Sequence, residues 1–302
     1  IAAELHVARG RLHAVSLPRA AVAQSGEVDL HMHSTASDGA LAPADVVAAA
    51  KNAGLAAIAL TDHDTLDGIP EATTAANAVG MRVVPGVELS AHDGAREIHI
   101  LALHVSNPGA LEIRLASFRR SRETRASRIV DRLNEIGVAV ELESVMAEAA
   151  GGAVGRPHVA RALIKAGKVR DSREAFDRYL GAGKAAFVEK ERLEIREAIA
   201  ITHDAGAIAI WAHPGPEGRR DRLEPLVEMG LDGVEVRHPS HNTQDAQRLA
   251  ALADFFGILY SGGSDWHGAP HVMRPIGGMH IPPTWLERQD QTVLRKRAFD
   301  VS

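Results

Sequence analysis

The chain has 302 residues, of which 45% are hydrophobic, with a formal net charge of −5 and no cysteine. This length and apolar content suit one large or two modest globular domains, and the charge gives no global reason to expect binding to nucleic acid or membranes. Without cysteine, disulfides and thiolate metal sites are excluded, so any metal must be held by His and carboxylates. No stretch is apolar over the length of a bilayer span, and we expect a cytoplasmic protein.

Residues 1–25 precede the first predicted strand. Ala21-Val22-Ala23 resembles a signal-peptidase site, but no convincing apolar run comes before it. We therefore expect residues 1–25 to form a peripheral N-terminal extension.

From residue 27 to residue 105, short apolar strands alternate with polar loops and amphipathic helices. Helices are predicted over Pro43–Asn52, with Gly54 past its end, and over Gly68–Val79, ended by Gly80. The predicted strands are Val28–Met32, Ala56–Leu60, Arg82–Leu89 with an interruption at Pro85-Gly86, and Glu97–Val105. The last two are expected to pair antiparallel across a turn at Asp93-Gly94.

Residues 110–195 lack strand patterns and are predicted to be helical and basic. Residues 111–196 hold 18 Lys and Arg against 13 Asp and Glu, a net of +5, so the rest of the chain holds about −10. Helices are expected along the stripe from Leu115 to Ile136, from Pro157, and over Arg173 to Leu180. The Arg-rich run Arg119–Arg132 is most simply a solvated helix face, although Arg122 and Arg125 could reach a cleft.

Strand–helix alternation resumes from about Ile195. Strands are predicted over Ala207–Ala212, Gly233–Arg237 and Gly257–Gly262, which gives about seven strands, mostly parallel. Polar clusters follow the strands at their C-terminal ends, where a (β/α) barrel builds its active site. We predict a distorted α/β barrel of seven strands over residues 26–109 and 196–302, with residues 110–195 inserted as a small helical cap.

The first polar cluster is Asp29-Leu30-His31-Met32-His33-Ser34. Alternation along the strand puts His31 and His33 on one face, where two imidazoles can hold a metal ion. Asp38 follows on a Gly-bearing loop that can bring its carboxylate to the same place. A surface histidine pair is the commoner meaning of His-x-His alone, but similar clusters recur at the ends of later strands.

Together the clusters supply six imidazoles and three carboxylates. They are His31, His33, Asp38, His63, Glu88, His99, His213, Asp265 and His267. This mixture suits Zn²⁺, Mn²⁺ or Fe²⁺ better than Ca²⁺, which prefers all-oxygen ligands. Nine ligands exceed the need of one ion and would serve two or three. The alternatives are solvated loop residues, or core histidines at His99 and His213.

The ordered motifs DLHMHS with SDG, LTDHD, PGVELS, EIHIL, AHPG and GSDWHG extend from residue 29 to residue 268. With them the chain resembles the PHP (polymerase and histidinol phosphatase) superfamily of metal-dependent phosphoesterases. The segments GRPHVARALIKAG at 155–167 and YLGAGKAAFV at 179–188 resemble the branch that acts on nucleotides and short RNAs. That branch includes ribonuclease AM, 3′,5′-nucleotide bisphosphatases and AMP phosphatases.

The resemblance implies a trinuclear site and a metal-bridging hydroxide that attacks phosphorus. Glu88, Asp265 and His267 would be catalytic. The implied ligands are His31, His33, Glu88 and Asp265 for the first metal, Glu88, His99 and His213 for the second, and Asp38, His63 and His267 for the third.

Four further residues are candidates for substrate binding. Arg156, His158 and Lys184 lie in the insertion, where they could bind phosphate or simply cap and cover helices. His238 follows a strand, where substrate contact and plain structure are both plausible. Asp62 and Asp64 flank His63 and could orient imidazoles or form a turn.

The leading hypothesis is a hydrolase that cleaves phosphate monoesters or diesters of nucleotides, such as AMP and 3′,5′-bisphosphonucleotides, or the 5′ ends of short RNA. The basic insertion favours a longer, more anionic substrate. A small-metabolite phosphatase, such as histidinol phosphatase, is the alternative among enzymes, and a non-catalytic metal-stabilised PHP module is the alternative outside them. No membrane contact and no stable protein partner are expected.

Overall fold

The computed structural model describes residues 26–149, 154–189, 192–268 and 275–299. The predicted extension over residues 1–25 lies outside this range. In the part of the chain that is described, no helix combines the length and the apolar character needed to cross a membrane.

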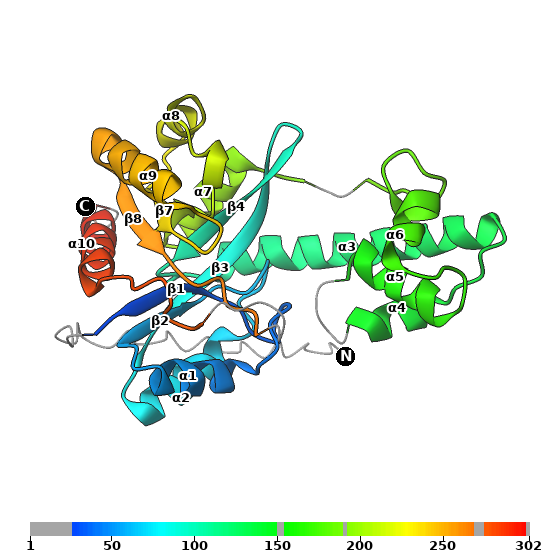
Figure 1. Ribbon diagram of the computed structural model, residues 1–302, viewed down its shortest axis with the longest axis horizontal. Helices are drawn as coiled ribbons and strands as arrows, with labels where there is room; N and C mark the ends of the chain where they lie inside the picture. Colours follow the sequence, from blue (N-terminus) through cyan, green and yellow to red (C-terminus); the bar gives the residue numbers. More distant parts are fainter. Residues whose placement is uncertain (1–25, 150–153, 190–191, 269–274, 300–302) are drawn as a thin grey trace, which may run out of the picture.

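Seven strands form a nearly closed barrel in the order β1-β2-β3-β4-β6-β7-β8 (Figure 1). β4 is antiparallel to both neighbours, and the other pairs are parallel. The strands are β1 Val28–Met32, β2 Ala57–Leu60, β3 Arg82–Asp93, β4 Arg96–Leu103, β6 Ile208–Trp211, β7 Gly233–Arg237 and β8 Leu259–Gly262. The predicted distorted seven-stranded barrel is thus confirmed.

The extension of β8 closes the barrel against β1. The Asp265 N–H donates to the His31 carbonyl at 2.9 Å, and the His33 N–H donates to the Trp266 carbonyl at 3.0 Å. Gly263 permits this approach, because a Cβ there would lie 2.4 Å from the Cβ of His31. Since the closing segment also contains Asp265, barrel closure and placement of that carboxylate depend on the same backbone contacts.

Six helices pack against the strands of the barrel through three hydrophobic clusters. They are α1 Pro43–Asn52, α2 Ile69–Val79, α7 Ile195–Asp204, α8 Arg220–Glu228, α9 Thr243–Phe256 and α10 Pro283–Phe299. Helix α2 ends at Gly80 with φ 61°, as the sequence predicted, and α9 ends at Gly257 with φ 66°. Gly257 was expected to begin β8, but it terminates the preceding helix because glycine adopts the left-handed conformation readily.

The inserted segment stands to the right of the barrel in Figure 1. It contains α3 Gly109–Glu135, α4 Leu142–Ala149, α5 Arg156–Lys165, α6 Ser172–Ala175 and a π-helical turn, Phe176–Leu180. The chain returns through β5, Leu193–Glu194, which pairs with β3. The single helix expected over Arg173 to Leu180 is therefore divided into a short α-helix and a π turn.

Helix α3 belongs to two hydrophobic clusters. Leu111 and Leu115, near its start, pack into the barrel-side cluster. Ile129 and Leu133, near its end, pack into a second cluster formed by the inserted helices. The insertion therefore has a core of its own and shares one continuous helix with the barrel. The division of the chain at residues 109/110 and 195/196 stays a prediction.

Strand β3 was expected to be interrupted at Pro85-Gly86, but it is continuous. The strand continues through both residues to Asp93, and Gly94 makes the predicted turn with φ 62°. A Cβ on Gly86 would lie 3.1 Å from the Ala102 carbonyl oxygen, so glycine here serves close strand packing rather than a strand end.

We predict that Gly263→Ala weakens barrel closure. Its Cβ would overlap the backbone of His31, and forced overpacking costs about 1–3 kcal/mol. Urea unfolding measures the loss. Gly109→Ala is the matched control, because the nearest atom to a Cβ there is 4.0 Å away. Equal stability of the two variants would contradict the proposed closure contact.

Candidate metal centre

All nine predicted metal ligands gather at one end of the barrel. They come from strand interiors or from the loops that follow strands: His31 and His33 from β1 and its end, Asp38 and His63 from the loops after β1 and β2, Glu88 and His99 from β3 and β4, His213 from the end of β6, and Asp265 and His267 from the end of β8. Parallel strands present their C-terminal ends at a common rim, so residues far apart in sequence meet there.

Glu88 lies at the centre of this group and is fully buried. Its two carboxylate oxygens are each close to several imidazole nitrogens. Oε2 is 3.1 Å from His31 Nε2, 3.2 Å from His33 Nε2 and 3.3 Å from His63 Nδ1, and Oε1 is 2.7 Å from His99 Nδ1 and 2.9 Å from His213 Nε2. Burial raises the pKa of Glu88, but the charge of His31 and hydrogen bonds from the surrounding imidazoles outweigh it and hold the pKa well below its usual range.

Asp265 adds a second carboxylate beside the two histidines of β1. Its Oδ1 lies 3.2 Å from His33 Nε2 and 3.5 Å from His31 Nε2. Together with Glu88, these residues offer four ligand atoms within 4.8 Å of one another. The arrangement is compact enough for all four side chains to contact one ion.

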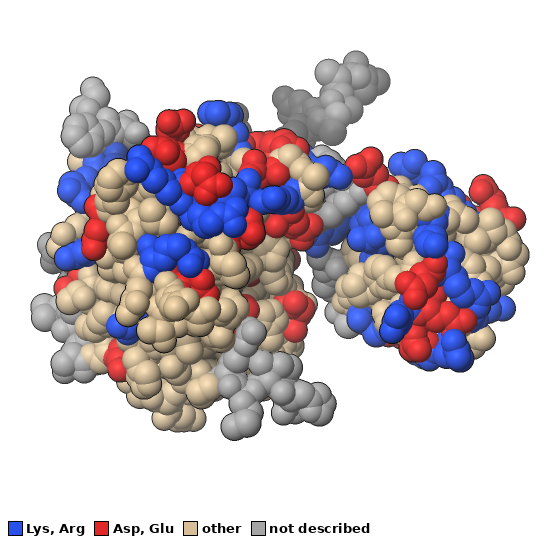
Figure 2. All heavy atoms as spheres, turned by 45° about the horizontal axis from the view of Figure 1, so that its top comes forward, with Lys and Arg blue, Asp and Glu red and all other residues tan. Residues whose placement is uncertain are grey.

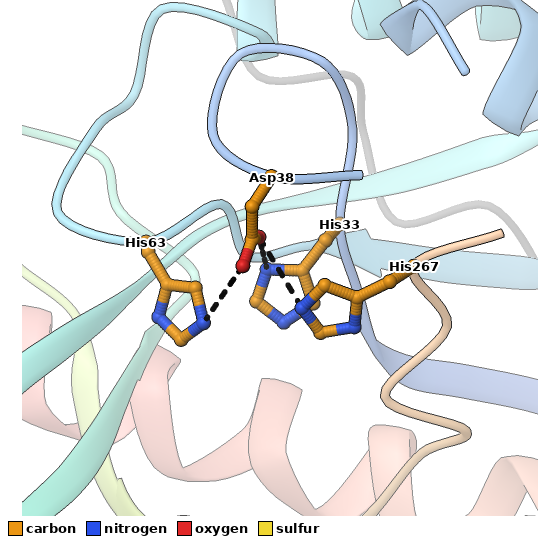
Figure 3. A group of neighbouring side chains, drawn as sticks. All are labelled: His33, Asp38, His63 and His267. Atoms are coloured by element: carbon orange, nitrogen blue, oxygen red, sulfur yellow. Dashed lines mark ion pairs between the residues drawn. The ribbon is translucent and has the colours of Figure 1, made fainter. Parts of the chain in front are cut away.

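A second four-residue group lies nearer the surface (Figure 3). Asp38 Oδ1 is 3.2 Å from His267 Nε2 and 3.8 Å from His33 Nδ1, and Asp38 Oδ2 is 4.0 Å from His63 Nε2. The Asp38 side chain is 57% exposed, whereas His33 is completely buried. His33 therefore faces the inner group with Nε2 and the outer group with Nδ1.

The donors fit divalent metal ions. A carboxylate offers about four lone-pair sites, yet five imidazoles converge on Glu88, so protons alone do not satisfy them all. Among the described residues, His33 has two buried ring nitrogens without a hydrogen bond. Imidazole nitrogens mixed with carboxylate oxygens are the ligands preferred by Zn²⁺, Mn²⁺ and Fe²⁺.

Two of the predicted ligands have backbone conformations that L-residues adopt rarely. His213 has φ 33° and Asp265 has φ 50°. Such strain persists only where surrounding contacts enforce it, and it concentrates at functional sites. Both residues lie two or three positions beyond the end of a strand, and their side chains contact Glu88 or the histidines of β1.

Asp62 fixes the loop that contains Asp38. Its Oδ1 accepts from the Ser34 N–H and the Ser37 hydroxyl, and its Oδ2 accepts from the Ser34 hydroxyl, each at 2.7 Å. Asp64 instead accepts from the Ser90 N–H at 2.9 Å. Asp62 thus holds the loop of a predicted ligand through serine contacts, and the role of either acid in orienting an imidazole stays a prediction.

Sequence reasoning missed Glu235, a fully buried carboxylate in β7. It contacts His31 Nδ1 at 3.1 Å. The available signal was a single acid in the middle of the apolar strand Gly233–Arg237. His238, predicted to contact substrate, is buried with Nε2 3.3 Å from Asp265 Oδ2, beside the candidate metal ligands.

The remaining predicted substrate residues lie in the insertion. Arg156 donates to the Leu180 carbonyl at 3.1 Å, and its guanidinium lies 5.5 Å and 5.4 Å from the rings of Phe176 and Phe187. His158 Nδ1 accepts from the Gly155 N–H at 2.9 Å, which caps the start of α5. Lys184 is exposed. Substrate contact by these residues stays a prediction.

Two arginines of α3 lie between the barrel and the insertion rather than on a solvated face. Arg122 pairs with Asp64, next to His63, and Arg125 Nε donates to the Val188 carbonyl at 2.8 Å. Burial and the charges of Arg156 and Arg122 lower the pKa of Arg125 to about 10. Arg122 thus joins α3 to the loop that holds His63 through an ion pair with Asp64.

Comparison with known proteins agrees with this geometry. The chain is 41% identical to a 5′-3′ exoribonuclease of Haemophilus influenzae over 79% of its length and 89% of the relative. It is 35% identical to a 3′,5′-nucleoside bisphosphate phosphatase of Chromobacterium violaceum over 85% of this chain and 93% of the relative. A crystal structure from Bifidobacterium adolescentis, of a protein assigned as a metal-dependent phosphoesterase, matches 89% of this chain and 96% of its own with a TM-score of 0.72 and 29% identity.

A model of the PHP domain matches residues 29–193, more than half of the chain. That range contains six of the nine predicted ligands, from His31 to His99, and the solved relative shares the barrel that brings in the other three. The protein belongs to the PHP domain family.

Proposed function

We propose that this protein is a metal-dependent phosphoesterase that hydrolyses phosphate esters of nucleotides or the 5′ ends of short RNA. The observation that supports this most strongly is Glu88, one buried carboxylate shared by five imidazoles. Relatives named as an exoribonuclease and as a nucleoside bisphosphate phosphatase support the substrate class. A third relative, 34% identical, is named as a phosphoribosyl cyclic phosphate diphosphodiesterase of Eggerthella lenta.

Two or three divalent ions, of Mn²⁺, Fe²⁺ or Zn²⁺, are the proposed cofactors. When bound, such ions neutralise charge on phosphate oxygens and activate the attacking water. The proposed ligand sets are His31, His33, Glu88 and Asp265; Glu88, His99 and His213; and Asp38, His63 and His267.

The protein's own groups would fix this arrangement. Glu88 holds the first two ligand sets together, because each of its oxygens faces a different group of imidazoles. His267 Nδ1 donates to the Asp265 carbonyl at 2.9 Å, which turns Nε2 of His267 toward Asp38. Asp265 and His267 would therefore position the ligand sets on either side of His33.

The insertion is proposed to read the part of the substrate beyond the scissile phosphate. Figure 2 shows Lys and Arg over much of the visible face of the insertion, with Asp and Glu among them. Arginine suits this task because its planar fork matches phosphate oxygens in a bidentate manner. A second phosphate, or the next nucleotide, would distinguish such a substrate from a small phosphorylated metabolite.

One screen tests the proposed activity. Mn²⁺-loaded protein is incubated with AMP, 3′,5′-bisphosphoadenosine, histidinol phosphate and a 5′-phosphorylated RNA trinucleotide, and released phosphate or nucleotide is measured. We expect hydrolysis of the nucleotides or RNA and little hydrolysis of histidinol phosphate. Preference for histidinol phosphate would favour the small-metabolite alternative, and no hydrolysis of any compound would favour a non-catalytic module.

We predict that Glu88→Gln lowers kcat/KM on the order of 100-fold or more, because a neutral amide cannot hold two charged ligand sets together. Circular dichroism should show an intact fold, since hydrophobic clusters hold the barrel together. Elemental analysis should show fewer bound ions. Glu228→Gln, an exposed acid at the end of α8, is the matched control. Turnover of Glu88→Gln close to that of the control would contradict the central role of Glu88.

We predict that Arg156→Ala and Lys184→Ala lower kcat/KM for 3′,5′-bisphosphoadenosine far more than for AMP. Loss of a charge-assisted contact costs about 1.5–3 kcal/mol, and only the bisphosphate presents the distal group. Arg161→Ala, which changes an exposed arginine on the same helix as Arg156, is the control. Because Arg156 also donates to the Leu180 carbonyl, urea unfolding of each variant separates a loss of stability from a loss of substrate binding. An equal loss on both substrates would show that these residues are not selective.

A further inference from the structure

Glu235 lies inside the barrel at the middle of β7 and is fully buried. Its register partner on β8 is Ser261, which is also buried. An ionised carboxylate in such a place is costly unless its oxygens are well bonded. The contacts of both oxygens therefore indicate what the residue does.

Each oxygen of Glu235 contacts a different candidate metal ligand. Oε1 lies 3.1 Å from Nδ1 of His31, and Oε2 accepts from the backbone N–H of His213 at 2.7 Å. His31 belongs to the first ligand set and His213 to the second. Glu235 thus contacts one residue of each ligand set, through atoms other than the ring nitrogens that face Glu88.

The contact with His31 selects one form of its ring. Both ring nitrogens of His31 face carboxylates at 3.1 Å, Nδ1 that of Glu235 and Nε2 that of Glu88. A carboxylate only accepts hydrogen bonds, so Glu235 keeps a proton on Nδ1, and the proton that a metal ion displaces is the one on Nε2. The lone pair is then on Nε2, which lies 3.1 Å from Glu88 and 3.5 Å from Asp265. The ring nitrogen that faces the cluster is the one able to bind a metal ion.

The contact with His213 acts on the backbone. His213 has φ 33°, a conformation that needs support from its surroundings. With its N–H held by Glu235, the ring turns inward and Nε2 lies 2.9 Å from Glu88. Loss of this hydrogen bond would leave a buried N–H unsatisfied and would free the turn that aims the ring.

We propose that Glu235 is a positioning residue that sets the His31 tautomer and the His213 backbone, and so prepares two ligand sets for metal at once. The inference depends on the metal binding of the proposed function and not on the identity of the substrate. Partners of this kind typically change metal affinity by about 10–100-fold when they are altered.

A competing possibility is that Glu235 is itself a ligand. Glu235, His31 and His238 have ligand atoms within 4.8 Å of one another. However, both oxygens of Glu235 are engaged by N–H groups. His238 Nδ1 accepts from the Ser240 N–H at 3.1 Å, so the proton of the neutral ring is on Nε2, the nitrogen that lies 3.3 Å from Asp265 Oδ2. An ion there would displace the proton of His31 Nδ1, so the hydrogen-bonded arrangement favours positioning over ligation.

Glu235→Gln tests the proposal, because an amide has one oxygen and can accept from His31 or from His213 but not from both. Mn²⁺ affinity is measured by competition with a chelator, without substrate. We expect affinity to fall about 10–100-fold, with kcat recovering toward wild type when Mn²⁺ is raised to saturation. Ser261→Ala, at the adjacent barrel position, is the matched control and should keep wild-type affinity.

Thermal melting of the metal-free variants separates positioning from a general loss of structure. We expect metal-free Glu235→Gln to melt close to the wild type, because glutamine keeps the volume and one acceptor oxygen, and Glu88 still compensates a charge on His31. Affinity within about twofold of wild type would overturn the proposal. So would one fewer ion at saturation, which indicates a ligand, or an affinity loss matched by early melting of the metal-free protein. If the wild type binds metal but hydrolyses no phosphate ester, the proposed function is wrong, whereas the effect of Glu235 on metal affinity can still be measured.

Discussion

The structure depends on a buried negative charge at Glu88. A carboxylate removed from water must be compensated, and here five imidazoles from four separate segments provide the compensation. Only a fold that returns strand after strand to the same rim can deliver so many side chains to one point. The barrel, the strained turns at His213 and Asp265, and the supporting acids Asp62 and Glu235 all serve this convergence.

The sequence predicted the barrel and its rim well, because apolar runs ending in polar clusters have a direct physical meaning in parallel sheets. His31 and His33 follow from strand alternation, and both lie where that reasoning places them. The predicted interruption of the strand at Pro85-Gly86 was wrong. Proline and glycine end many strands, but here Gly86 allows the strand to pack closely against Ala102.

Glu235 could not be assigned from the sequence, although its acid was visible. Barrel strands are buried on both faces, so alternation does not separate the inside of the barrel from the layer under the helices. Its two partners are 204 and 22 residues away, and no local pattern joins them. The sequence indicated that Arg122 could reach a cleft but not that it pairs with Asp64, because that contact depends on how the insertion meets the barrel.

The single helix shared by the two hydrophobic clusters has a mechanical consequence. Since α3 spans 27 residues, it is a rod about 40 Å long at the usual rise of 1.5 Å per residue. One added or deleted residue between Phe118 and Ile129 would rotate the outer part of the rod by about 100° relative to the barrel. The distance and the rotational phase between the candidate metal centre and the inserted helices are therefore set by the length of one helix.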